Sequence, residues 1–152
     1  MRLSVAGRKL HMRLWHKDLI HYLPQKQLVA QWRECCGIAR NINVLGHPNH
    51  ILVNKIMDYP IEHFIAYSQI VANEMRERGY TVHWERFMKW FPAELPWNHL
   101  GLSQADIFNQ WQDKRYLRQC FYNLQEKADN YGLSQDEYGR LYEFVWEELG
   151  DV

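Results

Sequence analysis

Apolar residues along most of this chain recur every three or four positions, which is the spacing of one face of an α-helix. The stretch "LPQKQLVAQWRECCG", residues 23–37, places Leu28, Trp32 and Cys36 four positions apart. Gly37 follows the pattern directly, and glycine is common just past the end of a helix. The sequence therefore predicts a helix over residues 24–36 that buries this stripe.

The stretch "YPIEHFIAYSQIVANEMRERGY" has the same arrangement, with Pro60 before a helical pattern and Gly79 after it. Proline is favoured at the start of a helix and glycine at its end. The predicted inward positions are Ile61, Phe64, Ile65, Ser68, Val71 and Met75.

A third helical pattern runs from Ser103 to Tyr131, with a possible break near Asp113 and with Gly132 as its end. Its inward positions are Ile107, Trp111, Leu117, Cys120, Leu124 and Ala128.

The motif "SQDE", residues 134–137, has the form of a capping box that begins a last helix. That helix has an acidic outer face, and its predicted inward positions are Tyr138, Leu141, Tyr142, Val145 and Leu149. The stretch "WFPAELPWNHLG", residues 90–101, is expected to be an ordered loop packed on the body. No stretch alternates convincingly as a strand, so the predicted class is all-α.

The length of 152 residues suits a single domain, and the apolar content of 47% excludes a disordered chain. No apolar run approaches the roughly 20 residues that cross a bilayer, and the first residues lack a secretory signal. Of the three cysteines, Cys35 and Cys36 are adjacent, which is a poor basis for a disulfide framework. We therefore expect reduced thiols and a cytoplasmic protein without a membrane partner.

The net charge of zero conceals a gradient along the chain. Residues 1–60 carry nine Lys or Arg against three Asp or Glu, a balance of +6, so residues 61–152 carry −6. Five of the eight histidines also lie in the first 60 residues, where they can add positive charge beside a polyanion. If the protein contacts phosphate, the N-terminal part is expected to do so, although a solvated basic face is an alternative.

With Trp32 and Cys36 turned inward, Arg33 and Glu34 fall about 100 and 200 degrees further around the helix axis. Both side chains could then reach the opposite, polar side of the helix. Periodicity alone favours an ordinary surface pair without a chemical task.

Three stretches resemble one protein family. "MRLWHKDLIHYLPQKQLVAQWRECCGIAR", from Met12, is similar to the opening of the pyrimidine-dimer DNA glycosylases, also called the endonuclease V family, and above all to their little-studied bacterial branch. "HILVNKIMDYPIEHFIAYSQIVANEMRERGY", residues 50–80, resembles the next part of that family, and "YLRQCFYNLQEKADNYG", residues 116–132, resembles the bacterial branch more loosely. The resemblance covers about residues 12–132.

The resemblance implies a compact helical fold and a DNA repair enzyme with DNA glycosylase and AP-lyase activities. In this family the α-amine of the mature chain attacks the sugar C1′ of a damaged nucleotide, and an imine forms as the base is released. An α-amine suits this role because its pKa is near 7.7 to 8.0, about 2.5 units below that of lysine. The mechanism implies no cofactor, and the expected partner is double-stranded DNA with damaged or abasic sites.

By resemblance, Glu34 is the carboxylate that stabilises the imine, and Arg33 is its phosphate-contacting neighbour. The basic residues nearby are expected to hold the backbone of a kinked duplex from which a nucleotide is extruded. The predicted DNA-binding residues are Arg13, His16, Lys17, Lys26, Gln27, Arg40, His50 and Asn54. Gln27 stands where some members have a DNA-contacting histidine, and His50 and Asn54 match the bacterial branch without an assigned role.

The start of the chain departs from the better-known members, in which a small threonine follows the initiator Met. Here Arg13 follows Met12, and its bulk should prevent removal of that Met. If translation starts at Met12, the predicted nucleophile is the Met12 amine, and the domain covers residues 12–152. If it starts at Met1, residues 1–11 form an N-terminal extension, and position 12 has only an amide nitrogen.

Three alternatives compete with this interpretation. His47 and His50 in "HPNH" are spaced as metal ligands can be, so metal catalysis is one alternative. A second is a catalytically inactive DNA-binding or protein-interaction module on the same fold. The third is that Trp84, Trp90 and Trp97 serve only in core and loop packing.

Overall fold

The computed structural model describes residues 13–50, 53–92 and 102–151. This part of the chain is helical and contains no strand, which confirms the predicted all-α class. The elements in chain order are η1 (Lys17–Tyr22), α2 (Gln25–Leu45), η2 (Asn54–Asp58), α3 (Ile61–Glu77), α4 (Trp84–Met88), α5 (Lys114–Asp129) and α6 (Gln135–Leu149).

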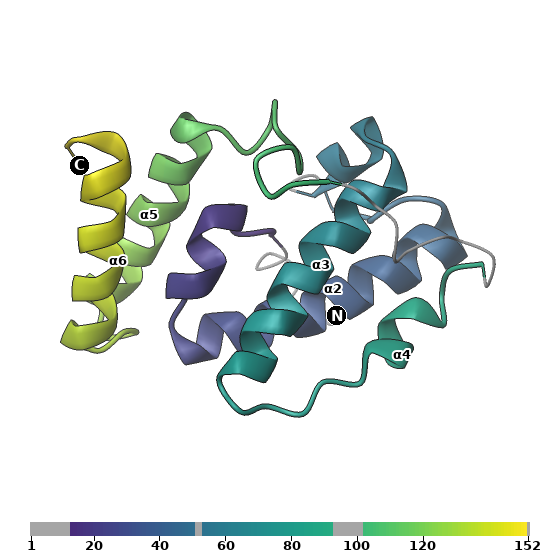
Figure 1. Ribbon diagram of the computed structural model, residues 1–152, viewed down its shortest axis with the longest axis horizontal. Helices are drawn as coiled ribbons and strands as arrows, with labels where there is room; N and C mark the ends of the chain where they lie inside the picture. The colour runs from purple at the N-terminus through teal and green to yellow at the C-terminus, as the bar shows by residue number, and fades with distance from the viewer. Residues whose placement is uncertain (1–12, 51–52, 93–101, 152) are drawn as a thin grey trace, which may run out of the picture.

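The helices form two groups with η1 between them (Figure 1). Helix α2 packs against α3 on one side and α4 on another, while α5 and α6 form an antiparallel hairpin. The 3₁₀ helix η1 contacts both α3 and α6, so the N-terminal segment joins the two groups. Five fully buried aromatic side chains fill the core, namely Phe64, Tyr67, Phe87, Phe108 and Phe121. No helix in the described ranges is long and apolar enough to cross a membrane.

Helix α2 is longer than its pattern predicts. Gly37 lies inside it, and the helix ends at Gly46, which has a φ of 89° and donates its N–H to the carbonyl of Ile42. The prediction that Gly37 ends the helix was therefore wrong. An interior glycine costs only about 1 kcal/mol relative to alanine, and burial of Ile38 and Ala39 further along outweighs that cost.

The buried face of α2 is also shifted from the predicted stripe. Leu28, Gln31, Cys35 and Ile38 are fully buried, whereas Trp32 and Cys36 are half-buried. The shift arises because α2 is covered from more than one side, with α3 and the segment before η1 over one face and α4 beside another.

The ends of α3 and the start of α6 match their patterns, although Tyr142, a predicted inward position of α6, is 40% exposed. Helix α3 begins after Pro60 and ends before Gly79, which has a φ of 93°, as predicted. The third pattern breaks at Asp113, whose side chain accepts the N–H of Tyr116 and caps α5, so residues 103–112 form turns instead of helix. The capping box of Ser134 and Glu137 is present at the start of α6. The predicted loop at residues 90–101 lies largely outside the described residues.

Candidate catalytic and DNA-binding site

The carboxylate of Glu34 lies halfway along α2 beneath the N-terminal segment. Its Oε2 accepts the backbone N–H of Arg13 over 2.9 Å. Burial raises the pKa of Glu34 to about 7, although the Arg13 N–H and the charges of Arg13 and Arg33 act in the opposite direction. Near neutral pH this carboxyl group is therefore present in both protonation states, which suits a group that exchanges protons during a reaction.

Gln31, one helical turn before Glu34, fixes the chain that passes over it. Its side-chain oxygen accepts the Trp15 N–H at 2.7 Å, and its side-chain nitrogen donates to the Arg13 carbonyl at 2.8 Å. The Tyr67 hydroxyl donates to the Trp15 carbonyl at 2.6 Å. Because Gln31 and Tyr67 are fully buried, this network holds residues 13–15 in one position relative to Glu34.

A cavity of about 440 Å³ opens beside the Glu34 carboxylate. We call it the Glu34 cavity. Three parts of the chain form it: the segment before η1, the first half of α2, and the second half of α5. Its lining residues are Arg13, Trp15, Lys26, Gln27, Ala30, Glu34, Asn123, Glu126 and Lys127. The Arg13 guanidinium lies 5.3 Å from the centre of the Trp15 ring, so a cation–π contact holds this charge at the cavity wall.

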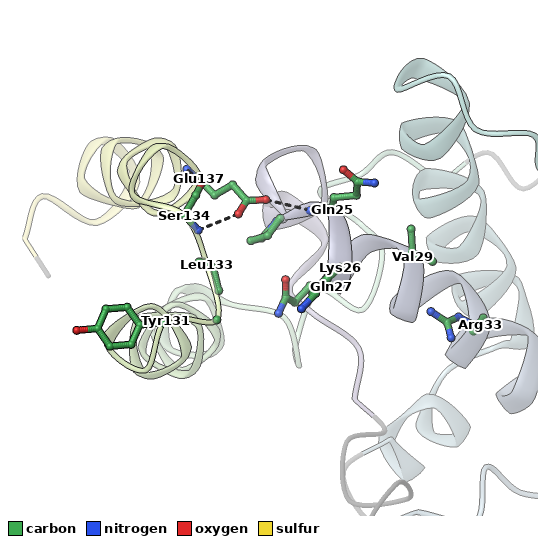
Figure 2. Close-up of a pocket in the computed structure, with 11 residues that line it drawn as sticks. Gln25, Lys26, Gln27, Val29, Arg33, Tyr131, Leu133, Ser134 and Glu137 are labelled. Carbon is green, nitrogen blue, oxygen red and sulfur yellow. Dashed lines mark hydrogen bonds between the residues drawn. The ribbon is translucent and has the colours of Figure 1, made fainter.

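A second cavity, of about 660 Å³, lies between the start of α2 and the turn that joins α5 to α6 (Figure 2). Lys26 and Gln27 line both cavities, so the two are neighbours. The Glu137 carboxylate crosses from α6 and accepts the N–H of Gln25 at 3.3 Å and that of Ser134 at 3.0 Å. The first N–H groups of α2 therefore already have an anionic partner, which makes this cavity a poor phosphate site.

Three cationic side chains follow one exposed line along α2. Lys26, Arg33 and Arg40 are all exposed and lie seven positions apart, so each is turned only about 20° from the last and rises about 10 Å along the axis. Lys26 borders the Glu34 cavity, whereas Arg33 lines the second cavity and, with Arg40, a groove against α4. Of the predicted DNA-binding residues, Arg13, Lys26 and Gln27 line the Glu34 cavity, whereas Arg40 lies further along α2 at the groove against α4.

Gln27 is half-buried, and its side-chain oxygen is buried with no hydrogen-bond partner among the described residues. A buried oxygen without a donor costs free energy, so a ligand that supplies an N–H or O–H group there would gain by it. Gln27 thus belongs to the site by position.

His16 and Lys17 do not lie on the surface as a DNA-contacting role requires. Their exposed fractions are 3% and 4%. The Lys17 ammonium donates to the carbonyls of Ala105 and Ile107, and the His16 ring accepts the N–H of Asp18 through Nδ1. These side chains hold the N-terminal segment to the turns at residues 103–112, and their prediction as DNA contacts is withdrawn.

His50 and Asn54 lie beyond the far end of α2. The His50 N–H donates to the Asn54 side chain over 3.4 Å, and neither residue lines the cavities beside Glu34. Met12, the predicted nucleophile, lies outside the described residues. No group of three or more His, Cys, Asp or Glu side chains in the described part could hold a metal ion, and the pair of His47 and His50 gains no third ligand there.

Helix α5 contributes to the site in a way that the sequence did not predict. Asn123, Glu126 and Lys127 line the Glu34 cavity although they lie about 90 positions after Glu34. No local spacing connects residues so far apart. Tertiary contacts place α5 here: α5 packs on α6, α6 contacts η1, and the Tyr116 hydroxyl of α5 donates to the Leu14 carbonyl. Arg86 and Lys89 were also absent from the predicted set, although their spacing of three indicates one helix face.

One of three comparisons with known proteins identifies a family. Residues 12–88 match the family model described as pyrimidine dimer DNA glycosylase. That region contains Arg33, Glu34 and the whole of the Gln31 network. Neither the curated proteins nor the solved structures include a significant match. Because the family model covers half of the chain, including Glu34 itself, the chain belongs to the pyrimidine dimer DNA glycosylase family.

Proposed function

We propose that this protein is a DNA repair glycosylase with AP-lyase activity on ultraviolet-type pyrimidine lesions, and that it acts through an imine at its N-terminal segment. The observation that carries the proposal is the contact of Glu34 with the Arg13 nitrogen over 2.9 Å. The half-buried carboxyl group of Glu34 has a pKa of about 7, and it faces Arg13, the first described residue of the region that matches the family.

In the proposed reaction an α-amine at this position forms a bond to the sugar C1′, and the bond from C1′ to the base breaks. The base leaves with a proton, and opening of the sugar ring gives an imine. Loss of a C2′ proton then allows the C3′–O bond to break, which nicks the strand. Glu34 in its ionised form stabilises the cationic imine, and in its protonated form it returns a proton to the departing group.

Two amines could occupy this position. In a chain that begins at Met12, the amine is one residue, or about 3.8 Å of backbone, upstream of the Arg13 nitrogen. In a chain cleaved after Met12, the Arg13 nitrogen itself becomes the amine and keeps its place beside Glu34.

The DNA backbone is expected to cross the α2 surface along Lys26, Arg33 and Arg40. Their axial span of about 20 Å corresponds to several phosphates of one strand. Arg13 and Lys127 add positive charge at the wall of the Glu34 cavity. We expect the damaged nucleotide to lie beside this cavity. Gln27 offers its unpartnered oxygen to a donor on that nucleotide.

Borohydride reduction tests the proposal because it converts an imine to a stable covalent adduct. Chains beginning at Met1, Met12 and Arg13 are incubated with ultraviolet-irradiated and abasic-site duplexes, reduced, and mapped by mass spectrometry. We expect an adduct on the α-amine of at least one chain, lost in the Glu34→Gln variant. Absence of an adduct from all three folded chains on both DNAs would exclude the lyase mechanism.

A catalytically inactive DNA-binding module is the second candidate. In the chain as it stands, the nitrogen beside Glu34 belongs to a peptide bond, and an amide nitrogen is no nucleophile. This candidate predicts binding to damaged duplex by every chain but an imine from none.

A further inference from the structure

A groove of about 450 Å³ separates α2 from α4, on the side of Arg33 away from the start of α2. We call it the α2–α4 groove. It carries four cationic side chains, and no Asp or Glu is among its lining residues in the described part of the chain. The lining residues are Trp32, Arg33, Cys36, Gly37, Arg40, Thr81, His83, Arg86, Lys89 and Trp90.

Two carboxyl groups lie next in sequence to groove cations, Glu34 beside Arg33 and Glu85 beside Arg86, but neither forms an ion pair with them. Arg33, Arg40, Arg86 and Lys89 form no ion pair with any residue that the structure describes. The acidic residue of α4, Glu85, is 75% exposed and pairs instead with His83 at 3.3 Å. The groove is therefore a concentrated anion-attracting surface.

Aromatic rings provide much of the remaining wall. The Trp32 ring is stacked on Trp84, with centroids 6.0 Å apart and planes 23° from parallel, and it also contacts Phe87. These contacts fix the ring before any ligand binds. Trp90 lies under the Lys89 ammonium, which is 4.8 Å from its ring centre.

Gly37 keeps the groove open. A Cβ atom added there would meet no atom within 4 Å, so the space above this helical glycine is empty. A long side chain at this position would occupy part of the groove and leave its four charges intact.

We propose that the α2–α4 groove binds a single-stranded stretch of DNA, with at least one base against the tryptophans and its phosphates on the four cations. A duplex backbone alone would need the cations but not the rings, because its bases are stacked on each other. Unpaired bases of any sequence can stack on aromatic side chains, and cationic side chains in the same groove bind the backbone beside them. The inference rests on the proposed function for the identity of the nucleic acid. It extends the path of the DNA from Arg33 and Arg40, which the groove shares with the duplex surface, to Arg86 and Lys89.

Cys36 provides a built-in reporter of occupancy. It is half-buried at the groove, whereas Cys35 and Cys120 are fully buried. Burial raises the pKa of the Cys36 thiol although Arg86 and Lys89 act against this, so labelling needs a small reagent in excess at a pH of about 8.5. An oligonucleotide of about eight thymidines has a length within the usual site size for single strands. It should slow labelling of Cys36 by about fivefold or more. The Cys36→Ser variant gives the background.

Parallel labelling reactions contain thymidine monophosphate or poly-glutamate of equal charge. Protection by the oligonucleotide but by neither of the others supports the proposal. Equal protection by the free nucleotide at the same phosphate concentration would make the groove a mononucleotide site, and protection by poly-glutamate would make it an acidic-peptide site; either result overturns the proposal.

The second measurement compares an abasic-site duplex with blunt ends to one with single-stranded overhangs of about four nucleotides. We expect the overhangs to tighten binding about tenfold, from stacking of one base. The Gly37→Leu variant should reduce this ratio, because leucine occupies space in the groove that a base would use. Gly139→Leu is the matched control, since Gly139 also lies inside a helix with nothing within 4 Å of an added Cβ.

Each variant is judged by the ratio of its affinities for the overhang and blunt duplexes. Any change in affinity for the duplex itself cancels in this ratio. Borohydride trapping on the blunt duplex reports the proposed function separately. If trapping succeeds but overhangs give no advantage and Cys36 is not protected, the groove proposal fails and the lyase stands. If trapping fails while protection and the overhang ratio persist, the lyase fails and the groove stands.

Discussion

The backbone nitrogen of Arg13 lies 2.9 Å from a carboxylate oxygen of Glu34, although 21 positions separate the two residues in sequence. Gln31, one turn earlier on α2, binds the Arg13 carbonyl and the Trp15 N–H, both of which follow this contact along the chain. Residues 13–15 are thus held to α2 by three hydrogen bonds. This arrangement fits a reaction in which the start of the chain, rather than a side chain, must be positioned.

Replacing Glu34 with glutamine should stabilise the protein at alkaline pH. The folded-state pKa of Glu34 is about 7, above its ordinary value of 4.5, so ionisation is unfavourable in the folded state. The wild-type protein should lose stability as pH rises from 4.5 to about 7 and change no further above that. Glutamine cannot ionise and can still accept the Arg13 N–H. We expect Glu34→Gln to gain about 2 kcal/mol at a pH of about 8 and little at a pH of about 4.5.

Urea denaturation at a series of pH values measures this effect. Glu126→Gln is the control, because Glu126 lines the same cavity but is exposed. A stability difference between wild type and Glu34→Gln that stays constant from acidic to alkaline pH would contradict the assigned cause.

Replacing Gln31 with methionine should both destabilise the fold and impair imine formation. Methionine fills a similar volume but leaves the Trp15 N–H and the Arg13 carbonyl without their partners, at about 1–3 kcal/mol for each buried group. We expect the free energy of unfolding to fall by about 2–4 kcal/mol. Trapping yield should also fall under conditions in which the variant is folded.

Gln125→Met is the comparison for that variant. Gln125 donates to the Tyr138 hydroxyl in the α5–α6 hairpin, so the substitution removes one hydrogen bond away from residues 13–15. Its trapping yield should match wild type. Equal yields from the two folded variants would show that the Gln31 network does not position the reacting segment.

The helical class and most helix boundaries could be predicted because they depend on local patterns. The capping box of Ser134 and the glycine after α3 act on residues within one turn. Gly37 does not end its helix because its local preference for a helix end is worth about 1 kcal/mol, less than the burial of Ile38 further on. The burial and the hydrogen bonds of the Gln31 side chain could not be predicted from a local pattern, because its partners lie 16 and 18 positions away in the sequence.

Lys17 shows why charge alone did not identify the DNA-binding residues. A lysine in a basic stretch is usually exposed, but this one is buried and donates to two carbonyls in the turns at residues 103–112. The sequence could not indicate that pairing, because the partners lie 88 and 90 positions away. The exposure of Arg33 could be predicted, because Arg33 lies on a helix whose buried face is defined by its apolar positions.

Lys17→Met should therefore reduce stability without changing DNA affinity. The buried carbonyl of Ile107 and the part-buried carbonyl of Ala105 would be left without their charged donor, so we expect the free energy of unfolding to fall by about 2–3 kcal/mol. Fluorescence anisotropy on a damaged duplex, at a temperature where the variant is folded, should give wild-type affinity within about twofold. A substantially weaker complex with the same salt dependence as Arg33→Gln would return Lys17 to the DNA-binding set.

Gly37→Ala should stabilise α2. Gly37 lies inside the helix, and an added Cβ meets nothing within 4 Å. Alanine removes the conformational freedom of glycine in the unfolded chain, so we expect a gain of about 0.5–1 kcal/mol. Thermal denaturation measures it. The same change at Gly46 should destabilise the protein, because its φ of 89° is strained for any residue with a side chain.

Neutralising the line of charge on α2 should weaken DNA binding in a way that salt reveals. The slope of log affinity against log salt becomes shallower by about 0.9 for every phosphate that the protein no longer neutralises. Replacing Lys26, Arg33 and Arg40 with glutamine should therefore reduce the slope by about 2.7 in total. Because phosphates carry no sequence information, the reduction should be equal for intact and damaged duplexes.

Replacing Lys114, Arg115 and Arg140 with glutamine gives a control of equal charge, since these exposed residues belong to the α5–α6 hairpin. Their removal should leave the slope within about 0.5 of wild type if direct phosphate binding rather than net charge determines it. Equal slopes for both triple variants would mean that the duplex responds to total charge and that α2 has no special place in the complex. A drop confined to the α2 variant would define the helix that carries Glu34 as the surface on which DNA lies.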